Sequence, residues 1–145
     1  MRMILRRFLW VGHGGALTSS CGSWLGSANG ALRGYGSFVI AEKNGADFIG
    51  WCGVNHYVGM TEPGIQWALT APHRGKGYMT EAGRTALDFA FQASNRNTLM
   101  TTIHPTNVTS QHTARRLNGA PTGEREVDVG ETVDLWRFSR VGGAA

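Results

Sequence analysis

The chain has 145 residues, of which 41% are hydrophobic and 17% are charged, and this composition predicts one domain with a sizeable core. The net charge of +4 favours an anionic ligand, but the basic residues are scattered, which argues against nucleic acid as a partner. Two cysteines form neither a disulfide framework nor a metal-binding pattern, so no metal is expected. The apolar run near the start is too short for a transmembrane segment or an export signal, so we expect a cytoplasmic protein without a membrane partner.

The first quarter of the chain has an unusual composition. Residues 3–11 are apolar and basic and are interpreted as one or two helical turns. Residues 12–36 hold eight glycines and show no periodicity, which predicts a loop or poorly ordered chain. The sequence therefore divides into a Gly/Ser-rich front segment, 1–36, a folded domain, 37–140, and a short tail, 141–145.

Regular patterns begin after this front segment. Strands are predicted at 38–41, 47–54, 65–70, 98–103, 124–129 and 132–138, with a hairpin turn at 43–45 between the first two. A helical period replaces them at 76–93, and a shorter helix is predicted at 107–117, closed by Asn118-Gly119. The order of these elements predicts an α/β fold in which helices pack on a mixed sheet.

The loop from Arg74 to Gly77 joins the third strand to the long helix. A helix start presents unpaired backbone N–H groups and a partial positive charge. Gly75 and Gly77 would let a diphosphate approach the backbone closely, and Arg74 and Lys76 add positive charge. The spacing is neither that of a Walker loop nor that of the dinucleotide fingerprint. The loop therefore favours a pyrophosphate-bearing ligand, and the alternative is a glycine-rich connection with ordinary surface charges.

The residues around this loop resemble a known family. The stretch Ile65-Gln66-Trp67-Ala68-Leu69, followed by Arg74-Gly75-Lys76-Gly77-Tyr78-Met79, resembles the acetyl-CoA motif of the GNAT superfamily of N-acetyltransferases. It is most similar to the branch that includes the ribosomal-protein alanine acetyltransferases, and the resemblance covers roughly residues 35–140. The resemblance implies a mixed, mostly antiparallel sheet with helices on both faces, and a front strand and helix that are missing or shortened.

The resemblance also implies acetyl-CoA as co-substrate and assigns residues to it. The backbone of Trp67, Ala68 and Leu69 would pair with the pantetheine arm, the loop Arg74, Gly75, Lys76, Gly77, Tyr78 and Met79 would hold the pyrophosphate, and Asn107 would touch the pantetheine. The alternative interpretation of the three strand residues is that they simply belong to the core, and that of Asn107 is that it caps the N-terminus of the helix. Met79 stands where the family usually carries Gly or Ala, so its side chain either points into the core or crowds the cofactor.

The catalytic residues are less well marked. Ser110, three residues after the family's Asn, is a candidate partner for the leaving thiolate, because Ala114 stands where many members carry a Tyr. A backbone N–H near residue 68 would polarise the thioester carbonyl. Gly64 replaces the Glu that members often place before the strand Trp. Glu62, His56 and His104 are therefore candidates for the general base, and their alternative is an ordinary polar role at the surface or at a strand end.

We expect an acetyl-CoA-dependent N-acetyltransferase that transfers an acetyl group to a primary amine, on a protein N-terminus or a small molecule, by direct attack on the thioester. The alternatives are a non-catalytic acyl-CoA-binding or interaction protein that kept the cofactor loop, and a basic module that binds nucleic acid through phosphates. A shortened front would leave an open acceptor site that a second chain completes, as in a homodimer, or would indicate an inactive relic.

Overall fold

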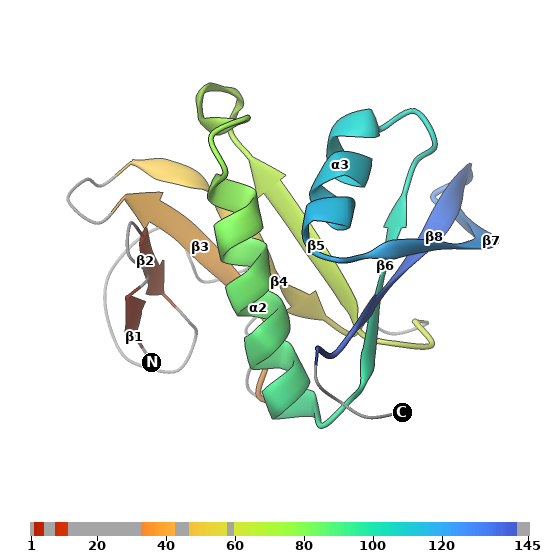
Figure 1. Cartoon of the computed structure of the whole chain (residues 1–145), viewed down its shortest axis with the longest axis horizontal. Helices are drawn as coiled ribbons and strands as arrows, with labels where there is room; N and C mark the ends of the chain where they lie inside the picture. The colour runs from red at the N-terminus through yellow and green to blue at the C-terminus, as the bar shows by residue number, and fades with distance from the viewer. Residues whose placement is uncertain (1, 5–7, 12–32, 43–46, 58–59, 142–145) are drawn as a thin grey trace.

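The computed structural model of the chain describes residues 2–4, 8–11, 33–42, 47–57 and 60–141 (Figure 1). Its strands are β1 (Arg2–Ile4), β2 (Phe8–Val11), β3 (Ser37–Glu42), β4 (Phe48–Asn55), β5 (Gly64–Leu69), β6 (Thr98–Ile103), β7 (Ala120–Asp128) and β8 (Glu131–Ser139). They form one sheet in the order β1-β2-β3-β4-β5-β6-β8-β7. Only β5 and β6 pair in parallel among these strands, so the predicted mixed, mostly antiparallel sheet is confirmed.

The strands after the front segment lie close to where the sequence pattern places them. β3, β4, β5, β6 and β8 begin and end within one residue of the predicted bounds. The turn predicted at 43–45 lies outside the described residues, but β3 and β4 pair antiparallel as the hairpin requires. β7 begins at Ala120, earlier than predicted. Its pairing with β8 is irregular between Pro121 and Arg125, so the first part of the strand lacks a regular pattern. A proline and a glycine there disguise the strand pattern.

The interpretation of residues 3–11 as helical turns is wrong. β2 occupies Phe8–Val11 and pairs antiparallel with β3, and β1 pairs antiparallel with β2. The hydrophobic pattern of four residues is too short to distinguish a strand from a helix. These residues form a strand because the edge of β3 is free to pair with them. The front therefore contributes two short strands to the same sheet. The glycine-rich residues 12–32 lie outside the described part of the chain, and Tyr35 after them is already buried.

Two α-helices, α2 and α3, connect strands of the sheet within residues 60–141. α2 (Tyr78–Ser94) buries one face of small and apolar side chains and ends at Asn95, whose φ of 51° is left-handed. α3 (Val108–Arg116) begins at Asn107, whose side chain accepts a hydrogen bond from the Ser110 N–H at 3.1 Å. Asn118, with a φ of 62°, and the glycine after it close α3 as predicted. A short 3-10 helix, η1 (Ala71–His73), precedes the glycine loop.

The two helices share one hydrophobic core with the sheet. α2 packs on β4 and β5 and also contacts α3 (Figure 1). Gly83 permits this approach, because a Cβ atom there would lie 2.6 Å from a methyl group of Leu117. Helices on the opposite face of the sheet, which the resemblance implies, stay a prediction.

The sheet opens between its two parallel strands. β5 pairs with β6 only through Gly64 and Met100. Beyond this pair the two strands diverge, and α3 lies between their far ends in Figure 1. The described part of β5 from Ile65 to Leu69 therefore has a backbone edge that β6 does not pair with.

Candidate functional site

A cleft of about 370 Å³ lies where the end of β5, the glycine loop and the first turns of α2 and α3 meet. Its lining residues are Trp67, Ala68, Leu69, Arg74, Gly75, Gly77, Tyr78, Met79, Thr80, Asn107, Thr109, Ser110, Thr113 and Arg116. The structure thus brings together nearly all of the residues that the sequence assigns to acetyl-CoA, although they come from three separate segments. We refer to this space as the first cleft.

The glycine loop exposes the start of α2 to the first cleft. Gly75 and Gly77 have φ values of 73° and 82°, which only glycine adopts without strain. A Cβ atom at either position would have no heavy atom within 4 Å, so both face open space. No side chain caps the first turn of α2. The Arg74 Nε–H donates to the Leu69 carbonyl at 3.2 Å and holds the loop against β5. The result is an electropositive backbone cradle suited to an anion.

Two loop residues, Met79 and Lys76, differ in their exposure: Met79 is buried and Lys76 is exposed. Met79 is 5% exposed and packs in the hydrophobic core, which is the first of the two alternatives, and it also forms part of the lining of the first cleft. Lys76 is exposed but does not line the first cleft. It can contribute to the field around the cleft, whereas Arg74 lies in its wall.

The register of β5 decides which backbone groups face the open edge. Hydrogen-bonded and non-hydrogen-bonded residue pairs alternate along an antiparallel ladder. The Thr70 N–H donates to the Ile49 carbonyl at 2.9 Å, so the same register directs the backbone groups of Ala68 toward β4. Those of Trp67 and Leu69 point toward the split between β5 and β6. The donor expected near residue 68 is therefore better supplied by its two neighbours.

Asn107 and Ser110 lie together at the start of α3 and both line the first cleft. Asn107 acts as the N-cap through its Oδ1 atom, as the simpler of its two interpretations required. Its Nδ2 group has no hydrogen-bond partner among the described residues. The Asn107 side chain can therefore cap α3 and still donate to a ligand in the cleft. The half-buried Ser110 is positioned in the first turn of α3, where its hydroxyl faces the same space.

The candidates for the general base lie elsewhere. His56 does not line the first cleft, and its Nε2 atom is 3.0 Å from the Met60 carbonyl oxygen. A carboxylate oxygen of Glu62 is 3.4 Å from a guanidinium nitrogen of Arg137 on β8. The imidazole of His104 contacts the Thr106 hydroxyl through Nδ1 at 2.8 Å, and its Nε2 is 3.7 Å from the Glu131 carboxylate. Neither side chain lines the first cleft. The structure therefore does not bring these three candidates together with Ser110.

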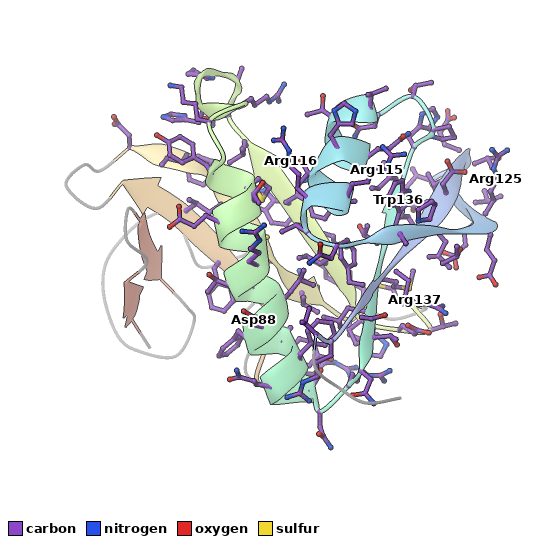
Figure 2. All side chains as sticks on the ribbon, in the orientation of Figure 1. Asp88, Arg115, Arg116, Arg125, Trp136 and Arg137 are labelled. Carbon is purple, nitrogen blue, oxygen red and sulfur yellow. The ribbon has the colours of Figure 1, made fainter. Side chains whose placement is uncertain are left out.

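Sequence reasoning missed four cleft residues, and a helical pattern could have found three of them. Thr109, Thr113 and Arg116 are spaced at i, i+4 and i+7 on α3, which places them on one face of the helix. Arg116 projects toward α2, whereas the neighbouring Arg115 lies over the ring of Trp136 at 5.1 Å (Figure 2). Arg116 has no acidic partner among the described residues. The first cleft therefore holds two arginines, and a free cation on α3 faces the loop.

A second cleft, of about 530 Å³, lies beside the first half of β5. Its lining residues are Tyr57, Met60, Thr61, Gly64, Ile65, Gln66, Met100, Thr101, Thr102, Glu126, Val127 and Asp128. Met60 occupies the space beside Gly64, because a Cβ atom at Gly64 would lie 2.8 Å from its terminal methyl group. The position where related sequences often carry a Glu is thus filled by a thioether side chain.

Other kinds of reactive group are not assembled in the described part of the chain. The described residues contain no cluster of three or more His, Cys, Asp or Glu side chains placed to hold a metal ion. Cys52 is fully buried, and burial raises the pKa of its thiol far above the usual range, so it is not a nucleophile. No helix among the described residues has the length and apolar character needed to cross a membrane.

The structure is similar to solved structures of acetyltransferases. An acetyltransferase from Agrobacterium tumefaciens matches with a TM-score of 0.79 and 22% identity, over 97% of this chain and 95% of that one. The ribosomal-protein-S5-alanine acetyltransferase from Vibrio fischeri matches with a TM-score of 0.64 and 22% identity, over 74% and 63% of the two chains. The yncA protein from Salmonella typhimurium, solved with its cofactor acetyl-CoA, matches with a TM-score of 0.63 and 17% identity, over 80% of this chain and 70% of that one.

The sequence itself matches a family model. The model describes the acetyltransferase (GNAT) domain, and the match spans residues 6–119, most of the chain. It begins inside the predicted front segment, in keeping with the place of β2 in the sheet. The chain therefore belongs to the GNAT acetyltransferase family.

Proposed function

We propose that this chain is an acetyl-CoA-dependent N-acetyltransferase that acetylates a primary amine by direct attack on the thioester. The observation that carries the proposal is the first cleft, where an uncapped helix start and an unpaired strand edge meet. A diphosphate matches the first feature because it accepts hydrogen bonds from several backbone N–H groups. An extended chain of amides matches the second because it can pair with a strand edge. Coenzyme A carries both groups in one molecule.

Each part of the cofactor has a proposed place in the first cleft. The pyrophosphate lies at the loop from Arg74 to Gly77, with Arg116 opposite as a second cation. The pantetheine arm runs along Trp67 and Leu69 and receives a hydrogen bond from the Asn107 amide. The thioester then lies near the split between β5 and β6, which pair only at Gly64 and Met100.

The reaction needs few groups from the protein. The amine nitrogen attacks the thioester carbonyl carbon, and a backbone N–H of Trp67 or Leu69 stabilises the negative charge on the carbonyl oxygen. The carbon–sulfur bond breaks, and the thiolate takes a proton from the Ser110 hydroxyl, which regains one from water. The amine must lose a proton before or during the attack. Because Glu62 and His104 lie outside the first cleft, we propose that water in the open split accepts this proton.

The test follows thiol release while the protein is incubated with acetyl-CoA and a panel of amines and peptide N-termini. Release that depends on an amine, with the acetylated amine identified by mass spectrometry, is the expected result. The rate should rise with pH as a larger fraction of the acceptor amine becomes neutral, because only the neutral amine attacks the thioester. Unchanged background hydrolysis across the whole panel would contradict the proposal.

One observation favours a second candidate function. Gly64 and the Met60 side chain occupy the position where a carboxylate base would be expected, as in a protein that binds acyl-CoA without turnover. Acetyl-CoA should then raise the melting temperature as it does for an enzyme, because ligand binding stabilises the folded state in either case. Stabilisation without amine-dependent thiol release would identify the binding protein. Absence of any stabilisation would exclude both functions.

A further inference from the structure

The two ends of the glycine loop are joined by a contact between aromatic rings. The ring of His73, the last residue of η1, lies 5.8 Å from the ring of Tyr78, the first residue of α2, and their planes are 48° apart. This separation is within the range in which aromatic side chains attract one another. Because residues 74–77 lie between the two rings, the contact closes the loop on itself.

Hydrogen bonds anchor the His73 ring to the sheet. The Thr70 hydroxyl donates to the Ile49 carbonyl at 3.0 Å, and its oxygen lies 2.7 Å from Nδ1 of His73. A hydroxyl group has one hydrogen, which the Ile49 carbonyl receives, so the hydrogen between Thr70 and His73 belongs to Nδ1. Ile49 on β4 is fully buried. The ring is therefore held to the core of the sheet through a single hydroxyl.

The two glycines between the rings have no side chains that could hold the loop. Gly75 and Gly77 both adopt left-handed φ values, and a Cβ atom at either position would meet no heavy atom within 4 Å. Glycine loses more conformational freedom on ordering than any other residue. Arg74 restrains the strand side of the loop through its Nε–H bond to the Leu69 carbonyl. The contact of His73 with Tyr78 supplies a restraint at the helix side.

Tyr78 connects this contact to the cofactor site. It lines the first cleft and packs against the hydrophobic core, whereas His73 does not line the cleft. Tyr78 also opens the first turn of α2, where no side chain caps the backbone N–H groups. A shift of Tyr78 would therefore move the N–H groups to which we assign the pyrophosphate.

We propose that His73 is a positioning residue for coenzyme A, which holds Tyr78 and the glycine loop in the shape that accepts the pyrophosphate before the cofactor binds. This inference rests on the placement of the pyrophosphate in the function proposed above. A loop that is already ordered loses less conformational entropy on binding, so its affinity is higher. Without the ring contact, only a fraction of the molecules has the competent loop, and the apparent Kd rises in inverse proportion to that fraction.

Isothermal titration calorimetry with CoA tests the inference in a double-mutant cycle of His73→Ala and Tyr78→Leu. His73→Ala should raise the Kd of CoA roughly 2- to 10-fold, the range expected for the loss of one aromatic contact. In the Tyr78→Leu background, the same substitution should change the Kd by less than about twofold, because the ring contact is already lost.

Two further variants separate the ring from its anchor. His73→Asn keeps a donor for Thr70 but has no ring, and its Kd should rise as that of His73→Ala does. His73→Phe keeps the ring and should recover most of the affinity. His104→Ala is the matched control, because Nδ1 of His104 also contacts a threonine hydroxyl, at 2.8 Å, but outside the first cleft. Its Kd for CoA should equal that of the wild type.

Steady-state kinetics give a second readout. His73→Ala should raise the KM for acetyl-CoA while kcat stays close to the wild-type value, because the lost contact serves binding and not the chemical step. An equal rise in Kd in both Tyr78 backgrounds would overturn the inference, since His73 would then act on the phosphates directly. Binding of CoA to the wild type with an unchanged Kd in His73→Ala would also overturn it and leave the proposed function standing. A wild-type protein that does not bind CoA would refute the proposed function itself.

Discussion

Replacing Gly77 with alanine tests the anion cradle at the start of α2. Gly77 has a φ of 82°, and an added Cβ atom would meet no heavy atom within 4 Å, so the strain comes from the backbone alone. A non-glycine residue in this conformation costs about 1–2 kcal/mol, which lowers the melting temperature of a domain of this size by about 2 to 8 °C. The methyl group would also project into the space that we assign to the pyrophosphate.

In Gly77→Ala, we expect the affinity for CoA to fall as well as the stability of the fold. Displacing the diphosphate from one backbone N–H removes a hydrogen bond to a charged group, worth about 1.5–3 kcal/mol, or roughly 10- to 150-fold in Kd. Isothermal titration calorimetry with CoA measures this change directly. We therefore expect Gly77→Ala to bind CoA at least about tenfold more weakly than the wild type, under conditions where both are fully folded.

Gly123→Ala is the matched control for backbone strain. Gly123 has a φ of 84° and equally open space around its Cβ position, but it lies on β7 and lines neither cleft. The melting temperature of Gly123→Ala should fall by about as much as that of Gly77→Ala, while the Kd of Gly123→Ala for CoA stays at the wild-type value. Equal CoA affinity in the two variants would refute the placement of the pyrophosphate at the start of α2.

Three further predictions concern other parts of the molecule. Arg116→Gln should weaken CoA binding roughly 3- to 10-fold and reduce its salt dependence, as measured by titration at two ionic strengths, whereas Arg115→Gln should change neither. Gly53→Ala should lower the melting temperature by about 3 to 10 °C, because its Cβ would lie 2.3 Å from backbone atoms of the neighbouring strand, and calorimetry that shows no change would contradict the packing. In a Cys21→Ser background, a thiol reagent at pH 8 should label Cys52 only after unfolding, and labelling of the native protein would contradict its burial.

The parts of the site that depend on local sequence could be predicted, and those that depend on tertiary pairing could not. The glycines of the loop and the cap at Asn107 act within a few residues of themselves, so their spacing carries the information. Glu62 looked available because it lies close to β5 in the chain. Its carboxylate is instead paired with Arg137, 75 residues away, and no local pattern reports such a partner.

The front of the chain shows the same limit in the fold. Phe8–Val11 becomes a strand because the edge of β3 is free to pair with it, and the paired residues lie 28 to 34 positions later in the chain. The second cleft was not expected either, since it is built from three strands and a loop that come together only in the folded sheet.

Because a single residue pair joins β5 to β6, the sheet consists of two ladders of paired strands that connect at one point. β4 and β5 pair from Gly64 to Leu69, and β6 and β8 pair from Thr98 to Ile103, so each ladder is continuous within itself. Between the ladders, backbone pairing is confined to Gly64 and Met100, and α2 also contacts α3. A ligand that contacts both ladders would hold them at a fixed angle, and the sheet would become more rigid when such a ligand binds.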